Sequence, residues 1–436
     1  MKNGKIKVGI GFATGRKQFQ RILRSYAYNW KESGLVDNHT VSLNLFVAYD
    51  VSYNNTKKKD YTQVGADIAE FVDSTHFIGG KEVQQIKNWL VQNDVLDAQE
   101  ASKLFRKGYA SQRNVVLFSA MVNQMDYLLF LDDDEYPVAV TNTLGTAVWG
   151  GQQVLKTHLE NIRHADITYG YHCGYISPIP CIEFTNRMRE KDFRLFIEAI
   201  SNDIINWKTI REVMKDGGVT YASTDVLTSR TAVEVPEIHS AKFISGSNLC
   251  INLTNYKMVY PFYNPPGARG EDTFLSTCLS EHTVLRVPCY TFHDGFSIYN
   301  HLLSGVLPTA LRFVTPASVQ IVKRFYKACV GWVRYKPLFL YITDPDTYPE
   351  KIEEMKEKLY RTVPLVCDYF KTKDFYTVLD ELNKYDRNVK KHYQEFLAVQ
   401  QIWTKIMTHF QQTSGKALKI PHRSAELKST GPMHGV

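Results

Sequence analysis

The stretch YLLFLDDDEYP, residues 127–137, joins an apolar run directly to four acidic side chains. The apolar part is typical of a strand that is buried on both faces, as in a sheet covered by helices on each side. The acids Asp132, Asp133, Asp134 and Glu135 repel one another, and a cation or a set of hydrogen-bond donors relieves that repulsion. The stretch therefore predicts a central strand that ends at a ligand site.

The segments around this strand alternate between strand patterns and helix patterns. Residues 5–13 and 40–50 alternate in the manner of strands, whereas residues 14–30 and 108–125 have helical spacing. Because strands and helices alternate, we predict an α/β fold with a mostly parallel central sheet that is flanked by helices. In such folds, ligands bind beyond the carboxyl ends of the strands.

The pattern of polar and apolar residues changes in the part of the chain after the acidic stretch. Residues 242–253 and 283–295 indicate two more strands, and a helix is expected to begin near Thr273. Between them and the acidic stretch, residues 203–240 are polar and rich in Gly, Ser and Thr, which favours a hairpin or a loop over the site. Beyond Pro308 the pattern is charged, amphipathic and helical.

These patterns predict three regions along the chain. Residues 1–305 are expected to form the α/β domain, with one half at 1–140 and the other at 141–305. Residues 306–410 are expected to form a helical C-terminal region, and residues 411–436 a flexible basic tail.

Composition narrows the class of protein. The chain has 436 residues and is 44% hydrophobic, which suffices for one or two packed cores. A net charge of +7 suits anionic ligands such as nucleotides and only weakly suggests nucleic acid. Its seven cysteines are scattered and odd in number, which favours free thiols in a reducing compartment. No apolar run approaches the ~20 residues that span a bilayer, so we expect a cytoplasmic protein without a transmembrane segment.

The spacing of the acids suggests how they bind a ligand. In an extended chain, alternate residues point the same way, so Asp132 and Asp134 are expected to share a face. Two carboxylates at that spacing suit a hard divalent cation that keeps some water and takes phosphate oxygens as its other ligands. The alternative is an acidic turn that caps a following helix.

Four segments in order resemble one enzyme family. LLFLDDDEYP (residues 128–137) resembles the Asp-x-Asp motif of the GT-A nucleotide-sugar glycosyltransferases of the family-two-like type. Residues 108–120 are similar to the helix before that motif, residues 244–253 to a Gly-containing strand, and residues 267–279 to an acidic segment that opens a helix beneath the acceptor. The resemblance covers roughly residues 5 to 300 and depends on order and spacing together.

This resemblance implies a GT-A fold and a metal-dependent, hexosyltransferase-type reaction that uses a UDP- or GDP-sugar. It implies that Asp132, Asp134 and His293 hold Mn²⁺ or Mg²⁺. It also implies a set of residues near the nucleotide-sugar, namely Ala13, Thr14, Arg16, Asp50, Arg113, Asp132 and Asp133.

A second acidic pair is the candidate for proton transfer. Glu271 and Asp272 precede an apolar helical stripe, and one of them is expected to deprotonate the acceptor hydroxyl as general base. The resemblance favours Asp272, with Glu271 as the alternate, and implies inversion at the anomeric carbon. The alternative is that neither acid is catalytic and both only interact with the helix dipole.

The acceptor is not specified by the sequence and is expected to be a glycan, a small molecule, a protein or a nucleic acid. Aromatic side chains that either stack on a sugar ring or belong to the core are Tyr169, Tyr171, Tyr175 and Trp207. Two other functions remain open: a nucleotidyltransferase that makes sugar nucleotides, and a non-catalytic module that binds carbohydrate or nucleic acid.

Overall fold

The structure is a computed structural model, and it describes residues 5–35, 40–201, 207–299, 302 and 305–413. These residues fall into two compact units. The first unit comprises the described residues up to Asp133, residues 250–259, and residues 405–413. The second unit comprises residues 134–249 and 260–404.

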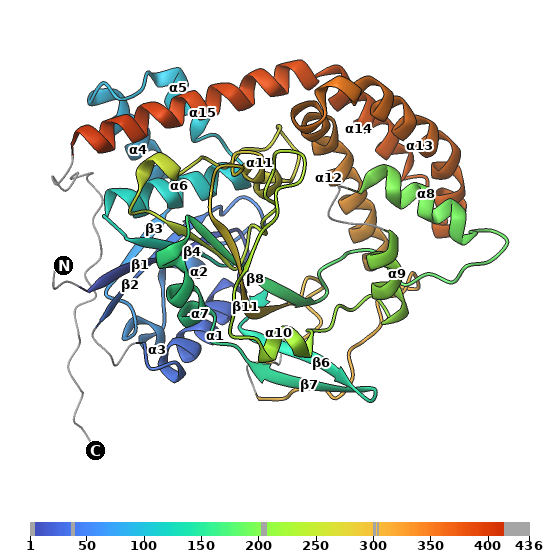
Figure 1. Cartoon of the computed structure of the whole chain (residues 1–436), viewed down its shortest axis with the longest axis horizontal. Coiled ribbons are helices and arrows are strands. Elements are labelled where there is room, and N and C mark those ends of the chain that lie inside the picture. The colour runs from blue at the N-terminus through green and yellow to red at the C-terminus, as the bar shows by residue number, and fades with distance from the viewer. Residues whose placement is uncertain (1–4, 36–39, 202–206, 300–301, 303–304, 414–436) are drawn as a thin grey trace. The chain divides into compact units, whose positions relative to one another are not determined.

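The first unit is built on a parallel sheet. Its strands are β1 (Ile6–Thr14), β2 (Val41–Tyr49), β3 (Ser74–Ile78) and β4 (Tyr127–Phe130), and they lie in the order β3-β2-β1-β4, with β10 (Leu249–Asn252) next to β4. The parallel register aligns the carboxyl ends of β1, β2 and β4 along one edge. The ribbons of β1 to β4 are drawn in blue to teal in Figure 1.

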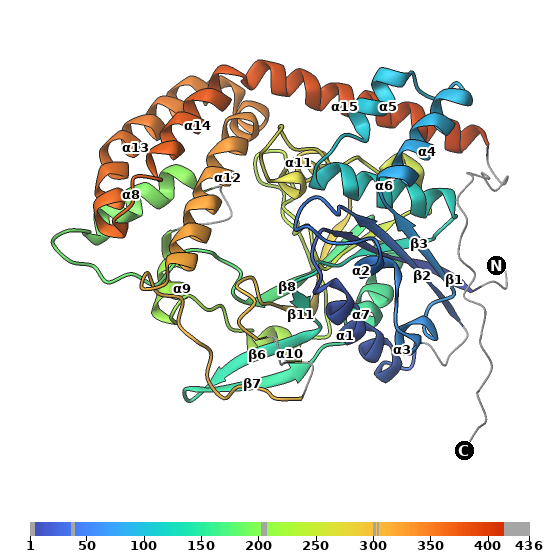
Figure 2. The ribbon, with the colours of Figure 1, turned by 180° about the vertical axis from the view of Figure 1, so that it is seen from behind.

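Helices cover both faces of this sheet (Figures 1 and 2). On one face, α6 (Tyr109–Val122) packs against β1 and β2. Gly11 permits this approach, because a Cβ atom at that position would lie 2.8 Å from Val116 Cγ1. On the other face, α1 (Phe19–Glu32) buries the predicted apolar stripe. The remaining helices of the unit are α2 (Lys59–Thr62), α3 (Ala66–Ala69), α4 (Gly80–Gln92) and α5 (Ala98–Leu104).

The second unit has its own strands. The strands β8 (Ile167–Gly174) and β11 (Val284–His293) are parallel, and the two short strands β5 (Glu135–Tyr136) and β9 (Val233–Glu234) pair with β11 in the antiparallel sense. A separate hairpin consists of β6 (Val138–Thr143) and β7 (Thr146–Gly151). Short helices connect these strands, namely α7 (Val154–Asn161), α8 (Glu190–Ile200), α9 (Trp207–Lys215), α10 (Thr224–Thr228) and α11 (Glu271–Ser276).

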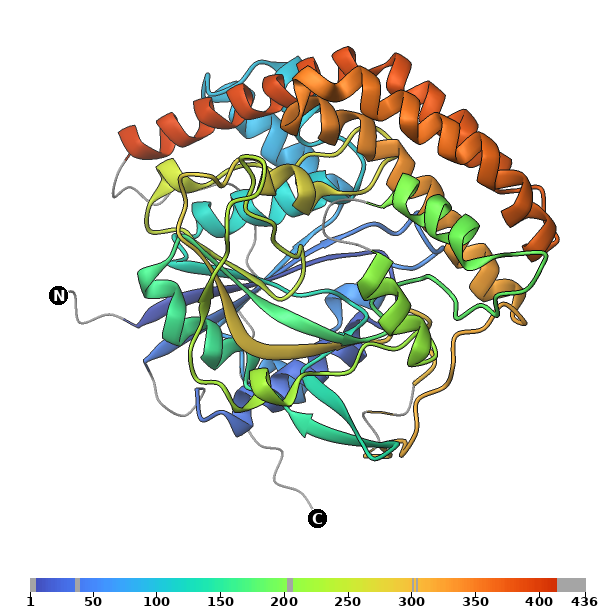
Figure 3. The same cartoon turned by 45° about the vertical axis from the view of Figure 1, so that its right-hand side comes forward.

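Long helices follow the strands. They are α12 (Val319–Thr343), α13 (Tyr348–Phe370), α14 (Tyr376–Arg387) and α15 (Val389–Gln412). The helices α12, α13 and α14 pack against one another, and α8 packs against α13 (Figure 3). The predicted helical region is confirmed, although its first helix begins at Val319. The predicted tail begins two residues too early, because α15 continues to Gln412, and residues 414–436 of that tail lie outside the described residues.

The chain is an α/β protein with a mixed, mostly parallel sheet and a C-terminal helical region, as the sequence predicts. None of the helices among the described residues has the length and apolar character that a bilayer-spanning segment needs.

A buried histidine in the second unit makes stability depend on pH. His158 is fully buried, its Nδ1 lies 2.7 Å from Thr168 Oγ1, and its Nε2 lies 2.8 Å from Asn248 Oδ1. Burial lowers the pKa of His158 to about 4, whereas an unfolded histidine has a pKa near 6.5. The unfolded chain therefore binds more protons between these two pH values.

We expect the free energy of unfolding to fall as the pH drops from 6.5 toward 4, with a contribution from His158 of about 2 kcal/mol at pH 5. A His158→Gln variant should show a weaker decline when unfolding midpoints are measured against pH. The matched control is His164→Gln at an exposed position, which should retain the wild-type dependence. Parallel pH profiles for wild type and His158→Gln would contradict the assignment.

Candidate functional site

The acidic stretch forms a turn between two strands. β4 ends at Phe130, Asp133 and Asp134 lie in a turn, and β5 begins at Glu135. The prediction of an extended chain through the acids is therefore wrong, because strand alternation does not continue through a turn, and a common face for Asp132 and Asp134 stays a prediction. A strand follows the acids, so they do not cap a following helix. The boundary between the two units falls between Asp133 and Asp134.

In the first unit, Asp133 is held by the end of β1. It accepts a hydrogen bond from Thr14 Oγ1, and its Oδ1 lies 3.0 Å from Arg16 Nη1. The sequence reasoning placed these three residues near the nucleotide, and the structure brings them into direct contact.

Asp132 contacts the helix α6 instead. Its Oδ1 accepts hydrogen bonds from Tyr109 Oη at 2.7 Å and from Arg113 Nη2 at 3.1 Å. The buried guanidinium of Arg113 also lies 4.9 Å from the ring centre of Tyr109 and 5.0 Å from that of Phe130. Arg113 is thus held by two aromatic rings and orients the carboxylate of Asp132.

The two other nucleotide candidates lie near the same edge of the first unit's sheet. Ala13 is buried within β1. Asp50 follows β2, its backbone N–H donates to the Thr14 carbonyl at 2.9 Å, and its carboxylate accepts hydrogen bonds from the backbone N–H and the hydroxyl of Ser52. The chemical groups that the first unit presents along this edge therefore include the carboxylates of Asp50, Asp132 and Asp133.

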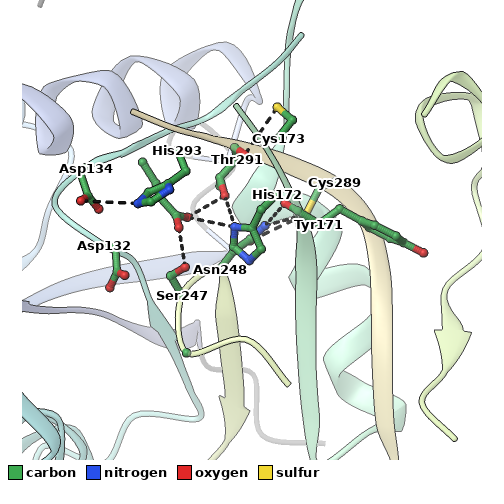
Figure 4. A network of polar contacts seen from close by, with 12 residues as sticks. Asp132, Asp134, Tyr171, His172, Cys173, Ser247, Asn248, Cys289, Thr291 and His293 are labelled. Atoms are coloured by element: carbon green, nitrogen blue, oxygen red, sulfur yellow. Dashed lines mark hydrogen bonds and ion pairs between the residues drawn. The ribbon is translucent and has the colours of Figure 1, made fainter. Parts of the chain in front are cut away.

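In the second unit, Asp134 faces a histidine. Asp134 Oδ2 lies 3.5 Å from His293 Nε2, at the end of β11 (Figure 4). The other ring nitrogen, Nδ1, lies 2.7 Å from the carbonyl oxygen of Tyr175. A carbonyl can only accept, so Nδ1 carries a proton and Nε2 is the nitrogen available for a ligand. Histidines that bind metals are commonly oriented in this way by a backbone carbonyl.

The surroundings of His293 control its charge. Burial disfavours the charged ring, but the neighbouring carboxylates Asp134 and Glu135 outweigh that effect and raise the pKa of His293 to about 9. At neutral pH a proton therefore occupies Nε2 unless a cation replaces it.

Glu135 is the centre of a buried network of polar contacts, and its partners Ser247, His172 and Thr291 are labelled in Figure 4. Ser247 Oγ and Thr291 Oγ1 each donate a hydrogen bond to its carboxylate at 2.6 Å, and His172 Nδ1 lies 3.4 Å away. Burial disfavours the charged carboxylate, but His172, His293 and Ser247 outweigh that effect and lower the pKa of Glu135 to about 2. Glu135 is thus a fixed negative charge next to the Asp134–His293 pair.

The second acidic pair lies against the same loop of the second unit. Asp272 accepts hydrogen bonds from the backbone N–H of Gly246 at 3.1 Å and from that of Thr273 at 2.9 Å. The residue after Gly246 is Ser247, which donates to Glu135. Consecutive Cα atoms are about 3.8 Å apart, so one dipeptide holds both acidic segments of this unit near each other.

Asp272 and Glu271 also occupy the first turn of α11. The residue before this helix, Gly270, has a left-handed backbone conformation with a φ of 89°. Both acids are therefore placed to interact favourably with the helix dipole, as the alternative interpretation expects. The bond from Gly246 is not explained by helix capping, because it comes from a distant loop.

The aromatic candidates differ in their surroundings. Tyr175 is buried among other aromatic rings and donates a hydrogen bond to the Arg312 carbonyl, and Trp207 packs against Phe193. These two belong to the core. Tyr171 is half-buried, and the guanidinium of Arg286 lies 3.6 Å from its ring centre. Tyr169 lies under the same guanidinium, at 5.5 Å.

The donor set of the second unit fits a divalent cation. Two ligands on neighbouring corners of an octahedral Mg²⁺ or Mn²⁺ ion are about 3 Å apart, and the carboxylate oxygen and imidazole nitrogen here are 3.5 Å apart. Among the residues that the structure describes, no group of three or more His, Cys, Asp or Glu side chains surrounds one point. The cation would therefore take its remaining ligands from phosphate and water, which is usual for Mg²⁺ at a phosphate site.

Comparison of the chain with models of protein families gives no match, and comparison with curated proteins gives none either. The assignment of a function depends on the residues described above.

Sequence reasoning missed three parts of this arrangement. It named Glu135 among the acids without assigning it a role, and it did not identify the Tyr175 carbonyl or the Gly246–Ser247 dipeptide as supports. The SGSN segment, residues 245–248, offered a signal, but its partners Glu135 and Asp272 are 112 and 26 residues away in the chain.

Proposed function

We propose that the protein is a metal-dependent, hexosyltransferase-type glycosyltransferase that transfers a sugar from a UDP- or GDP-sugar to an acceptor hydroxyl, with inversion. One observation supports this most: Asp134 Oδ2 faces His293 Nε2 at 3.5 Å, and the Tyr175 carbonyl orients the ring. These are two of the three residues that the resemblance assigns to the metal. The third, Asp132, remains a prediction.

The residues would act in the following way. Asp134 and His293 would bind Mn²⁺ or Mg²⁺, while the Tyr175 carbonyl holds the imidazole in the required tautomer. The bound cation would offset the negative charge that develops on the leaving nucleoside diphosphate. Glu135 would add a fixed negative charge that favours cation binding.

Asp272 would act as the general base. Both of its carboxylate oxygens accept backbone hydrogen bonds, which fix its position and leave further lone pairs for the acceptor hydroxyl. As the acceptor oxygen forms a bond to the anomeric carbon, its proton would pass to Asp272. The bond from that carbon to the diphosphate oxygen breaks, and the diphosphate leaves with the electron pair.

Metal removal tests this proposal directly. With Mn²⁺ present, the purified protein should release UDP or GDP from one sugar nucleotide of a panel, and excess EDTA should abolish the release because the cation stabilises the leaving group. Released nucleoside diphosphate is measured by a coupled assay, and added Mn²⁺ beyond the chelator should restore it.

The other functions give different products. A nucleotidyltransferase would form pyrophosphate from a nucleoside triphosphate, and a binding module would consume neither substrate. Undiminished transfer in EDTA would contradict the role of the metal.

A further inference from the structure

The helical C-terminal region contributes a cation beside the candidate metal ligands of the second unit. Arg324 lies in the second turn of α12 and is half-buried. Its guanidinium lies 4.8 Å from the ring centre of Phe296, which limits the positions it can adopt.

Gly295 brings Arg324 and His293 together. A Cβ atom at Gly295 would lie 2.7 Å from Arg324 Nη2, 2.7 Å from His293 Cε1 and 3.2 Å from His293 Nε2. Both side chains therefore meet over the bare backbone of this glycine, and the two nitrogens are less than about 6 Å apart. The edge of the ring that approaches Arg324 is the one that carries the ligand nitrogen.

Two cationic groups at this separation repel each other. A metal ion on His293 Nε2 would place its positive charge close to that of Arg324. An anion that contacts both groups would convert the repulsion into two attractions.

We propose that Arg324 anchors the diphosphate of the donor beside the Asp134–His293 pair. This inference rests on the proposed function and extends it to the C-terminal helical region. A guanidinium donates in a fork that matches two phosphate oxygens, and it stays charged at any working pH. Arg324 would hold the leaving diphosphate beside the Asp134–His293 pair, and it would remain bound to it as the bond to the sugar breaks.

The test measures binding rather than turnover. Isothermal titration with inorganic pyrophosphate and Mn²⁺ should show that Arg324→Gln weakens pyrophosphate binding by about 10- to 100-fold, the usual range for a lost charged hydrogen bond. Titration with Mn²⁺ alone should give an affinity no weaker than that of the wild type, because Arg324 does not bind the metal and its loss removes a repulsion. Arg324→Lys, which keeps the charge but loses the fork, should lie between the two.

Lys323→Gln is the matched control. It removes one positive charge from the neighbouring, exposed position of the same helix and should leave pyrophosphate binding unchanged. Equal losses in Lys323→Gln and Arg324→Gln would mean that only the net charge matters, and would overturn the anchor.

A second pair of variants separates this inference from the proposed function. If Asp134→Asn abolishes pyrophosphate binding and Arg324→Gln does not weaken it, the metal site stands and the anchor is wrong. If only Arg324→Gln weakens it, the anchor stands and metal-dependent transfer is contradicted. A wild-type protein that binds no pyrophosphate, with or without Mn²⁺, overturns both.

Discussion

Replacing Asp134 with asparagine is expected to lower the rate of sugar transfer by about 100- to 1,000-fold, the range found when one group that stabilises transition-state charge is lost. An amide has the shape of the carboxylate but no charge, so it binds a divalent cation weakly and does not attract His293. The backbone carbonyl of Asp134, which accepts a hydrogen bond from the Asp294 N–H at 3.0 Å, is unchanged. We therefore expect the variant to fold.

The measurement has two parts. Release of nucleoside diphosphate gives the rate, and titration with Mn²⁺ gives the affinity for metal, which should fall as well. Asp380→Asn is the matched control, because it makes the same chemical change at an exposed position of α14. Wild-type turnover and wild-type Mn²⁺ affinity in Asp134→Asn would remove the basis of the proposed function.

Replacing Asp272 with asparagine is expected to reduce transfer by about 100- to 10,000-fold, the usual contribution of a general base. Binding of Mn²⁺ and of the sugar nucleotide should persist, because Asp272 is not among the predicted ligands of either. The expected pattern is therefore a fall in kcat with nearly unchanged donor binding.

Stability must be measured in the same variant. The Asp272 carboxylate accepts backbone hydrogen bonds on both oxygens, whereas the asparagine amide has only one accepting oxygen. One backbone N–H then loses its partner, which costs about 1–3 kcal/mol if that group is buried. A thermal unfolding curve shows whether lost activity reflects chemistry or unfolding.

Glu271→Gln is the matched control for Asp272, since both acids lie in the first turn of α11. If Asp272→Asn transfers normally and Glu271→Gln does not, Glu271 is the base. If both variants transfer at the wild-type rate, neither acid takes the proton, and the substrate must supply its own base.

Local patterns predicted most of the strands and helices in the first unit. The alternation of apolar residues in residues 5–13 and 40–50 corresponds to β1 and β2, and the helical stripe from Phe19 to Trp30 is buried in α1. These elements depend mainly on the burial of neighbouring apolar side chains, and that information is present in a short window of sequence.

The acidic stretch shows where local patterns fail. Strand periodicity predicts that Asp132 and Asp134 point the same way, but the chain turns at Asp133 and Asp134. Asp132 then meets Arg113, Asp133 meets Thr14 and Arg16, and Asp134 meets His293. A turn depends on the contacts that each acid finds, and those partners are distant in sequence.

By itself, the sequence determined the α/β class, the helical C-terminal region and the position of four acids at the end of a buried strand. Only the tertiary structure decided which groups surround those acids. His293 of β11 faces Asp134, Ser247 of a loop donates to Glu135, and the Tyr175 carbonyl contacts the ring of His293. The physical reason is the distance over which each interaction acts. Periodic burial can be recognised within a few residues of sequence. Hydrogen bonds and ion pairs act over a few ångströms in space, so residues 100 or more positions apart form them only after the chain has folded.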